Sequence, residues 1–165
     1  MARNLGKKLA TNQRKKWQLL LQSSDATTEA GRSQISVVLL DTNVWYSAIL
    51  YGGKPEEIIK ISINTYRIVI SDFIIDELKS KLKREARAPY KWLNFLELHL
   101  KRICDVVEVL EIPSIARDPK DDPVIAAALR ANCGYLIAGD KDLLAIKQLG
   151  ELVILTPKQF IDLLD

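Results

Sequence analysis

Residues 36–43 read SVVLLDTN. The five residues 36–40 form a short, continuous apolar run, which is typical of a strand buried in a parallel sheet. Asp41 follows this run directly. Ligand sites in open parallel sheets gather just beyond the carboxyl ends of the strands. Asp41 is therefore the first candidate for a functional residue.

Strand-like and helix-like patterns alternate along the chain beyond this point. Further apolar runs predict strands at residues 67–70, 106–110, 135–138 and 152–155. Helical periodicity predicts helices at residues 56–63, 72–85, 90–103 and 123–131, and a last helix beginning near Pro157. Such alternation is typical of an α/β fold, in which helices cover a central parallel sheet.

The first 35 residues differ from the rest in charge and composition. Residues 1–36 carry seven Lys or Arg against two acids, whereas residues 37–165 carry 17 basic and 19 acidic residues. Residues 23–34 lack large apolar side chains and are rich in Ser, Thr and Ala. We interpret residues 1–35 as a basic, flexible extension with a linker, and residues 36–165 as the folded domain. An organellar presequence or a nucleic-acid-binding arm has a similar composition.

Composition excludes several classes of protein. A chain of 165 residues has room for one such domain. Its apolar runs are far shorter than the roughly 20 residues that cross a bilayer, so we expect a cytoplasmic protein without a membrane anchor. Cys104 and Cys133 stand far apart and His99 is the one histidine, which favours neither a zinc site nor a disulfide framework.

Acidic residues follow several of the expected strands. Asp41 follows the first, Asp72 lies two positions after the second, and Asp140 lies just beyond the strand at 135–138, with Asp142 two positions later. Because parallel strands end at one edge of the sheet, these acids are expected to meet there.

A further acidic run, RDPKDDP (117–123), opens the helix expected at residues 123–131. Pro123 fits the first helical position, which makes Asp122 the expected N-cap. Asp121 adjoins it, and consecutive helical residues point about 100° apart, so one of the two acids can face a site well.

Clustered carboxylates need relief from their mutual repulsion. Two of them about 5 Å apart repel by roughly 3 kcal/mol at an effective dielectric near 20. A divalent cation provides that relief, and an all-oxygen ligand set favours Mg²⁺ or Mn²⁺ over zinc. Such a site is equipped for phosphodiester hydrolysis.

Three segments carry a resemblance to a known family. VVLLDTNVWYSAILYGG, SDFIIDELKSKLKR and RDPKDDPVIAAALRANCGYLIAGDKDLL resemble the successive motifs of PIN-domain nucleases, especially the VapC-like toxins of toxin–antitoxin pairs. The resemblance covers about residues 36–163. It implies a three-layer α/β/α PIN-like fold and Mg²⁺- or Mn²⁺-dependent cleavage of single-stranded RNA. It also implies a cognate antitoxin as partner.

The resemblance further implies which acids bind metal and catalyse. They are Asp41, Glu77, Asp122 and Asp140, with Thr42 and Asn43 as supporting neighbours of Asp41. Asp142 and Asp121 are expected as possible additional ligands. Glu77 is preferred over its neighbour Asp76 because of the resemblance.

Two residues are candidates for RNA contacts. Lys141 lies between two acids, and Trp45 lies close enough to Asp41 to stack on a base. The basic residues of the helix at 72–85 face either solvent or RNA phosphates. Exposed apolar helix surface leaves a homodimer open.

Two other functions stay open at this point. A haloacid-dehalogenase-like phosphatase also begins with Asp after its first strand, but it carries a second Asp two residues later, where this chain has Asn43. A catalytically inactive PIN-like module that binds RNA or a protein partner is the non-enzymatic alternative. Metal binding without RNA cleavage would favour that module.

Overall fold

The computed structural model describes residues 8–24 and 36–165. Within this part of the chain, a six-stranded sheet runs in the order β3-β2-β1-β4-β6-β5. The strands are β1 (Val37–Leu40), β2 (Arg67–Ser71), β3 (Asp105–Val107), β4 (Tyr135–Ile137), β5 (Gln148–Leu149) and β6 (Leu152–Leu155). All neighbours pair in parallel except β5 and β6, which are antiparallel.

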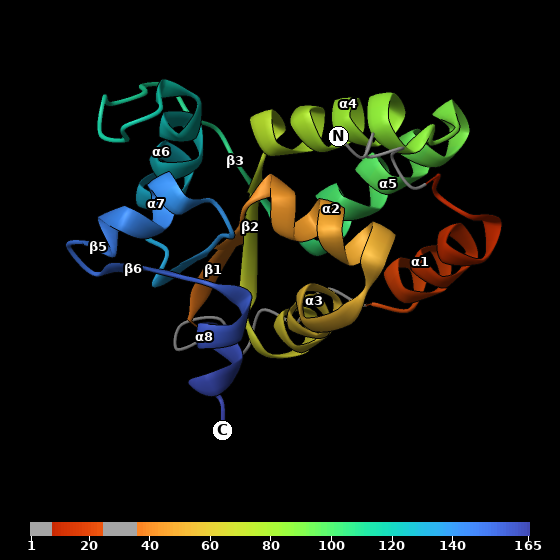
Figure 1. The fold of residues 1–165 in the computed structure, drawn as a ribbon, viewed down its shortest axis with the longest axis horizontal. Coiled ribbons are helices and arrows are strands. Elements are labelled where there is room, and N and C mark those ends of the chain that lie inside the picture. Colours follow the sequence, from red (N-terminus) through yellow and green to blue (C-terminus); the bar gives the residue numbers. More distant parts are fainter. Residues whose placement is uncertain (1–7, 25–35) are drawn as a thin grey trace, which may run out of the picture.

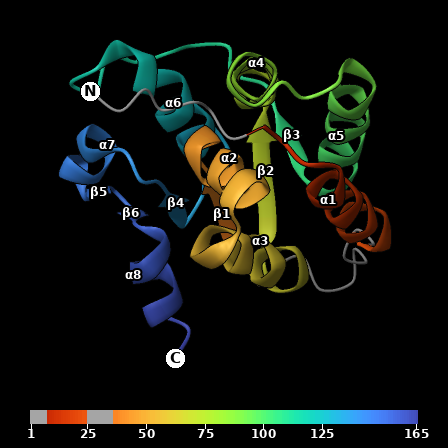
Figure 2. The same cartoon turned by 45° about the vertical axis from the view of Figure 1, so that its right-hand side comes forward.

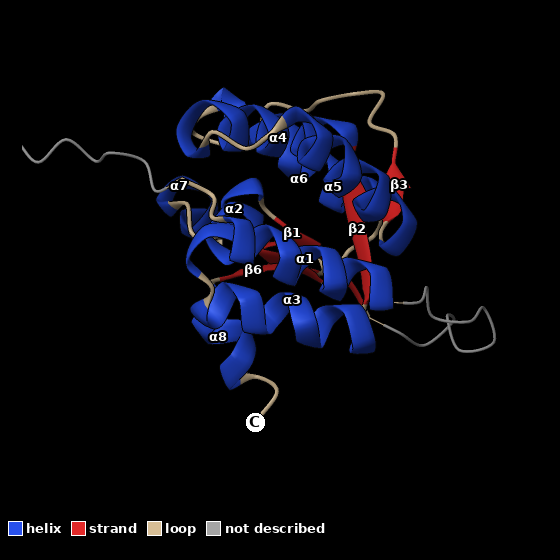
Figure 3. Ribbon diagram, turned by 90° about the vertical axis from the view of Figure 1, so that its right-hand side faces the viewer, coloured by secondary structure: helices blue, strands red, loops and turns tan. Residues whose placement is uncertain are grey.

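Helices flank this sheet, as Figures 1 and 3 show. They are α1 (Thr11–Ser23), α2 (Thr42–Tyr51), α3 (Gly53–Thr65), α4 (Asp72–Ala86), α5 (Tyr90–Ile103), α6 (Asp122–Arg130), α7 (Lys141–Ile146) and α8 (Pro157–Asp162). A short 3₁₀ helix, η2 (Pro119–Asp121), leads into α6. The predicted α/β fold with a central, mostly parallel sheet is confirmed.

The central strand β1 is as buried as its apolar sequence predicts. Val38, Leu39 and Leu40 are inaccessible to solvent, and β2 and β4 pair with β1 on its two sides. A residue that directly follows β1 therefore lies in the middle of the sheet edge at which the strands end. Figure 2 shows the neighbouring strand β2 running up toward α4 at that edge.

Some predicted elements differ from the observed ones. The helix α2 was not expected, because its residues are apolar on nearly all sides and lack a clear stripe. The strand expected at residues 106–110 covers only Asp105–Val107, because the chain then leaves the edge of the sheet. Asp122 lies inside α6 with φ −58° and ψ −40°, and not in the extended N-cap conformation, because η2 already turns the chain into the helix.

The helix α1 departs from the loosely ordered segment expected at the N-terminus. Leu9, Trp17 and Leu21 are almost fully buried, and α1 packs against α5 and α2. The sequence pattern did not indicate a packed helix here, because polar Asn12 and Lys16 interrupt the apolar stripe of α1. Residues 25–35, where the linker and domain boundary are expected, lie outside the described residues, so that boundary stays a prediction.

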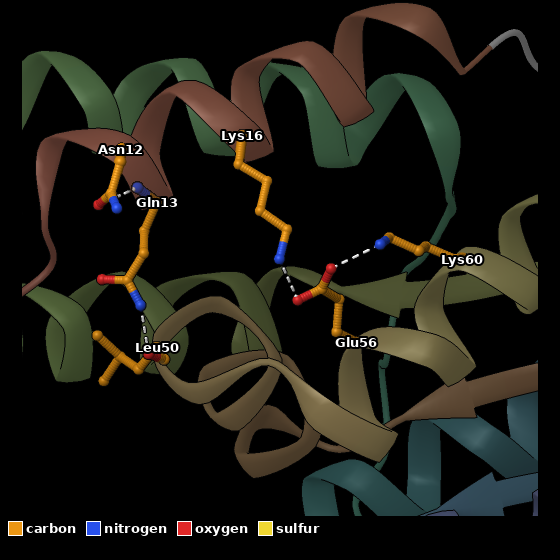
Figure 4. Close-up of polar contacts among 6 residues, drawn as sticks. All are labelled: Asn12, Gln13, Lys16, Leu50, Glu56 and Lys60. Carbon is orange, nitrogen blue, oxygen red and sulfur yellow. Dashed lines mark hydrogen bonds and ion pairs between the residues drawn. The ribbon is translucent and has the colours of Figure 1, made fainter.

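Polar side chains of α1 contact the neighbouring helices, and one of these contacts explains the interruption of the apolar stripe at Lys16 (Figure 4). Lys16 Nζ lies 2.5 Å from one carboxylate oxygen of the buried Glu56, and Lys60 Nζ lies 2.6 Å from the other. Burial alone would raise the pKa of Glu56, but hydrogen bonds from the two lysines bring it below its ordinary value. The amide of Gln13 donates to the carbonyl of Leu50 at the end of α2. These contacts join α1 to α2 and α3.

The two cysteines and the character of the helices can also be compared with the expectations from the sequence. Cys104 and Cys133 are both buried free thiols. Among the described residues, no helix combines the length and the apolar character that crossing a bilayer requires.

Candidate active site

Asp41 is the N-cap of α2 and lies at the end of the central strand. Its backbone N–H donates to the carbonyl of Ile137 in β4, at 2.9 Å, which fixes the residue against two neighbouring strands. Its side chain is buried, with 6% of the residue exposed. Asp41 therefore holds a carboxyl group inside the protein at the edge where β1 and β4 end.

The environment of Asp41 raises its pKa to about 7. Burial is the largest cause, because it penalises the charged carboxylate. A hydrogen bond from the backbone of Thr42 opposes the rise, whereas the negative charges of Glu77, Asp121 and Asp140 add to it. A carboxyl group surrounded in this way favours either a proton or a cation beside it.

Glu77 is brought to the site by α4. Its Oε2 accepts a 2.6 Å hydrogen bond from the hydroxyl of buried Thr42, the first residue of α2. Ile74 and Leu78 are buried on the adjoining face of α4 and so fix the rotation of the helix. The negative charge of Glu77 is among the causes that raise the pKa of Asp41. The geometry thus favours Glu77 over its neighbour.

Asp121 and Asp122 face different surroundings. The buried carboxylate of Asp122 accepts hydrogen bonds from the backbone N–H groups of Ile115 (2.9 Å) and Ala116 (2.7 Å). Asp121 is the one that joins the acidic cluster. The pKa of Asp121 is raised to about 6. Burial is the largest cause, and the negative charges of four neighbours contribute as well, namely those of Asp140, Asp118, Asp142 and Glu77.

The motifs favour Asp122 for the metal site, whereas in the structure its Oδ1 accepts two backbone hydrogen bonds and the charge of Asp121 acts on Asp41. Asp122 holds the loop before η2 against the start of α6. Helix geometry allowed one of the two acids to face the site, but the choice depended on a loop conformation that the sequence does not specify.

Asp140 is the acid that also caps a helix. Its Oδ1 accepts hydrogen bonds from the backbone N–H groups of Asp142 (2.8 Å) and Leu143 (3.2 Å) at the start of α7. The cap fixes its side chain near Asp41 and Asp121, whose pKa values it helps to raise. Asp72, by contrast, is exposed and pairs with Lys101 at 3.0 Å.

A second group of acids extends this cluster. One carboxylate oxygen each of Asp118, Asp121 and Asp142 lies within 4.8 Å of the other two. Asp118 was not among the expected site residues. Its spacing of three residues from Asp121, across the turn of η2, is the signal that would have found it.

Three other expected site residues differ in their exposure and contacts. Asn43 is exposed at the start of α2, and its Oδ1 accepts a 2.6 Å hydrogen bond from Lys81. Lys141 is exposed on α7 between Asp140 and Asp142, and its contact with RNA stays a prediction. Trp45 is 0% exposed, so it packs in the core and presents no face to a base, in contrast to the expectation.

The residues present fit a hard divalent cation. The described cluster supplies carboxylate oxygens, which are the ligands that Mg²⁺ and Mn²⁺ prefer. Asp121 Oδ2 is buried and has no hydrogen-bond partner within the described structure. A bound cation would provide the partner that this oxygen lacks and would offset the repulsion that raises the pKa values of Asp41 and Asp121.

Solved structures that are similar to this chain include the following two. A chain of VapBC2 from Rickettsia felis, solved bound to a DNA fragment from their promoter, matches with a TM-score of 0.52 and 15% identity. The match covers 73% of this chain and 98% of that chain. The RRP44 PIN domain of T. brucei matches with a TM-score of 0.43 and 14% identity, over 85% of this chain and 92% of that chain. No curated protein matches the sequence.

The family of the chain follows from its sequence. The family model described as "PIN domain" matches residues 37–142, which is well over half of the chain. The matched segment begins with β1 and extends through η2 to Asp142, so it contains every acid of the cluster. The chain belongs to the PIN domain family.

Proposed function

We propose that this protein is a metal-dependent endoribonuclease that hydrolyses phosphodiester bonds of single-stranded RNA. The observation that carries the proposal is the meeting of acids from four parts of the chain at one end of the sheet. Asp41 follows β1, Glu77 belongs to α4, Asp121 ends η2 and Asp140 precedes α7. Their mutual electrostatic effects support a shared site.

We propose Asp41, Glu77, Asp121 and Asp140 as the residues that would hold Mg²⁺ or Mn²⁺, with Asp142 and Asp118 as neighbours that extend the site. When bound, such a cation polarises a phosphoryl oxygen and lowers the pKa of a coordinated water. We propose Asp121 in the place expected for Asp122, because the charge of Asp121 acts on the pKa of Asp41 and its Oδ2 is buried without a hydrogen-bond partner among the described residues.

The protein's own groups keep the carboxylates in position. Thr42 orients Glu77 through its hydroxyl, and the start of α7 orients Asp140 through two N–H groups. Burial keeps water away from Asp41, which strengthens its interaction with a cation or with a proton. Outer hydrogen bonds of this kind hold ligands in the geometry that a cation needs.

The nuclease reading is favoured over the alternatives. Membership of the PIN domain family supports it and gives no support to a haloacid-dehalogenase-like phosphatase. The expected acids Asp41, Glu77 and Asp140 are all placed around one region, as an active enzyme requires. An inactive binding module predicts no cleavage, so the experiment below separates the two.

We further propose that the protein is the toxin of a toxin–antitoxin pair and that a small antitoxin protein is its partner. The motifs resemble VapC-like toxins, and the structurally similar chain comes from VapBC2 of Rickettsia felis. A homodimer and a cytoplasmic location stay predictions.

The direct test is cleavage of an end-labelled single-stranded RNA by wild type and by an Asp41→Asn variant, with Mg²⁺, with Mn²⁺ and with EDTA. We expect cleavage by wild type with either metal and none with EDTA, and a loss of at least about 100-fold in the variant. RNA duplex and single-stranded DNA test the substrate class. Equal cleavage by both proteins would reject the site, and metal binding without cleavage would favour the inactive module.

A further inference from the structure

The helices α2 and α4 meet along three successive side-chain contacts that begin at the proposed active site. Thr42 Oγ1 donates to Glu77 Oε2 at 2.6 Å. One residue further on, Lys81 Nζ donates to Asn43 Oδ1 at 2.6 Å. A side-chain hydrogen bond between Tyr46 and Glu85 forms the third contact. The same two helices therefore position an acid of the site and, one turn away, a lysine.

Lys81 differs from Lys79 and Arg84 of the same helix in its partners. Lys79 pairs with Glu97, and Arg84 lies 3.0 Å from Glu85. The described hydrogen bond of Lys81 goes instead to the neutral amide oxygen of Asn43. An ammonium group has three donors, so this contact leaves capacity for an anionic ligand. The carboxylate of Glu85 also lies close enough to interact with the charge of Lys81.

The position of Lys81 is fixed although its head group reaches the surface. Its Nζ lies 4.4 Å from the centre of the Tyr46 ring, and Tyr46 is itself buried. Lys81 is half-buried and its partner Asn43 is exposed. A lysine held by a ring and an amide loses less conformational entropy on binding a phosphate than a free surface lysine does.

The spacing relates this cation to the acids. Lys81 follows Glu77 by four residues, so both lie on one face of α4, about 6 Å apart along its axis. Asn43 likewise adjoins Thr42, which contacts Glu77. An RNA strand whose phosphodiester lies at the acids therefore has another phosphate within reach of Lys81.

We propose that Lys81 binds a phosphate of the RNA strand adjacent to the scissile one, and that Asn43 and Tyr46 hold it in place for this purpose. The inference rests on the proposed ribonuclease function and adds a substrate-binding residue to it. The contact recognises the backbone and carries no base specificity.

The test compares Lys81→Met with Lys83→Met. Methionine retains an apolar stem over Tyr46 but removes the charge, and Lys83 is an exposed lysine of the same helix that serves as the control. Binding of a single-stranded RNA oligonucleotide is measured in an Asp41→Asn background at several salt concentrations. We expect Lys81→Met to reduce the slope of log affinity against log salt by about 0.7, the amount for one phosphate contact on a single strand. The control should retain the parent slope.

A second test measures KM and kcat for RNA cleavage by Lys81 variants that retain Asp41. Lys81→Met is expected to raise KM several-fold more than it lowers kcat, and Lys81→Arg is expected to restore most of the KM. An unchanged salt slope and KM in Lys81→Met, with active wild type, would overturn this inference and leave the ribonuclease function intact. Failure of wild type to bind or cleave RNA would overturn the ribonuclease function itself.

Discussion

The hydroxyl of Thr42 donates a 2.6 Å hydrogen bond to Oε2 of Glu77, and this contact joins the first residue of α2 to the middle of α4. One residue beside the proposed metal site thus orients an acid from a helix 35 positions away in sequence. The DTN segment supplies Asp41 to the cluster and also positions a second member of it.

Removing this hydroxyl should weaken metal binding. Thr42→Val keeps the size of the side chain but leaves Glu77 without its donor, and partners of this kind affect metal affinity by roughly 10- to 100-fold. We expect the Kd for Mn²⁺, measured by calorimetry, to rise within that range. Thr42→Ser, which retains the hydroxyl, serves as the control. Wild-type affinity in Thr42→Val would show that the hydrogen bond does not orient a metal ligand.

The raised pKa of Asp41 predicts a pH-dependent stability in the metal-free protein. A carboxyl with an ordinary pKa of 3.8 when unfolded and about 7 when folded keeps its proton longer in the folded state. The free energy of unfolding should therefore fall as pH rises from about 4 to 7. The amide of the Asp41→Asn variant does not titrate, so the variant does not lose stability in this way. The free energy of unfolding of the variant minus that of wild type should therefore rise by on the order of 2 kcal/mol between pH 5 and pH 7.

Urea unfolding of both proteins in EDTA measures this difference. Saturating Mg²⁺ is expected to stabilise wild type more at pH 8 than at pH 5, since the cation favours the charged carboxylate. A stability difference between the two proteins that does not change with pH would show that Asp41 titrates normally in the folded protein.

The helix α1 lies outside the segment that the family model matches. Because it packs on the domain, substitutions of its buried residues should have a large effect on stability. Trp17 is 1% exposed, so Trp17→Ala should cost roughly 3 to 5 kcal/mol of unfolding free energy. Leu19 on the same helix is 69% exposed, and Leu19→Ala should change the stability by less than about 0.5 kcal/mol. Urea unfolding compares the two. Equal stability of both variants and wild type would mean that α1 does not pack on the domain in solution.

The sequence predicts the central features of the fold because they depend on local patterns. The continuous apolar run before Asp41 specifies a buried parallel strand, and the alternation that follows specifies the sheet covered by helices. The acids Asp41 and Asp140 are found by the same reasoning, since the ends of parallel strands meet.

The features that the sequence did not predict depend on loop conformation or on contacts between distant segments. Asp121 and Asp122 have different surroundings because the loop before η2 directs the backbone N–H groups of Ile115 and Ala116 at Asp122. Lys16 interrupts the apolar stripe of α1 because it pairs with the buried Glu56 of α3, a partner that the sequence does not indicate. Trp45 next to the DTN segment looks available to RNA, but the packing of α2 buries it.

The most direct test of the proposed site is a metal titration of the neighbouring variants Asp121→Asn and Asp122→Asn. Each exchanges one carboxylate for an amide of nearly the same size, at adjacent positions of the chain. Binding of Mn²⁺ is followed by calorimetry, and RNA cleavage is measured on the same samples. We predict that Asp121→Asn loses both at least about 100-fold, whereas Asp122→Asn, which retains an acceptor for the two backbone N–H groups, stays within a few-fold of wild type. Loss of metal binding in Asp122→Asn, with Asp121→Asn unaffected, would contradict the site described above.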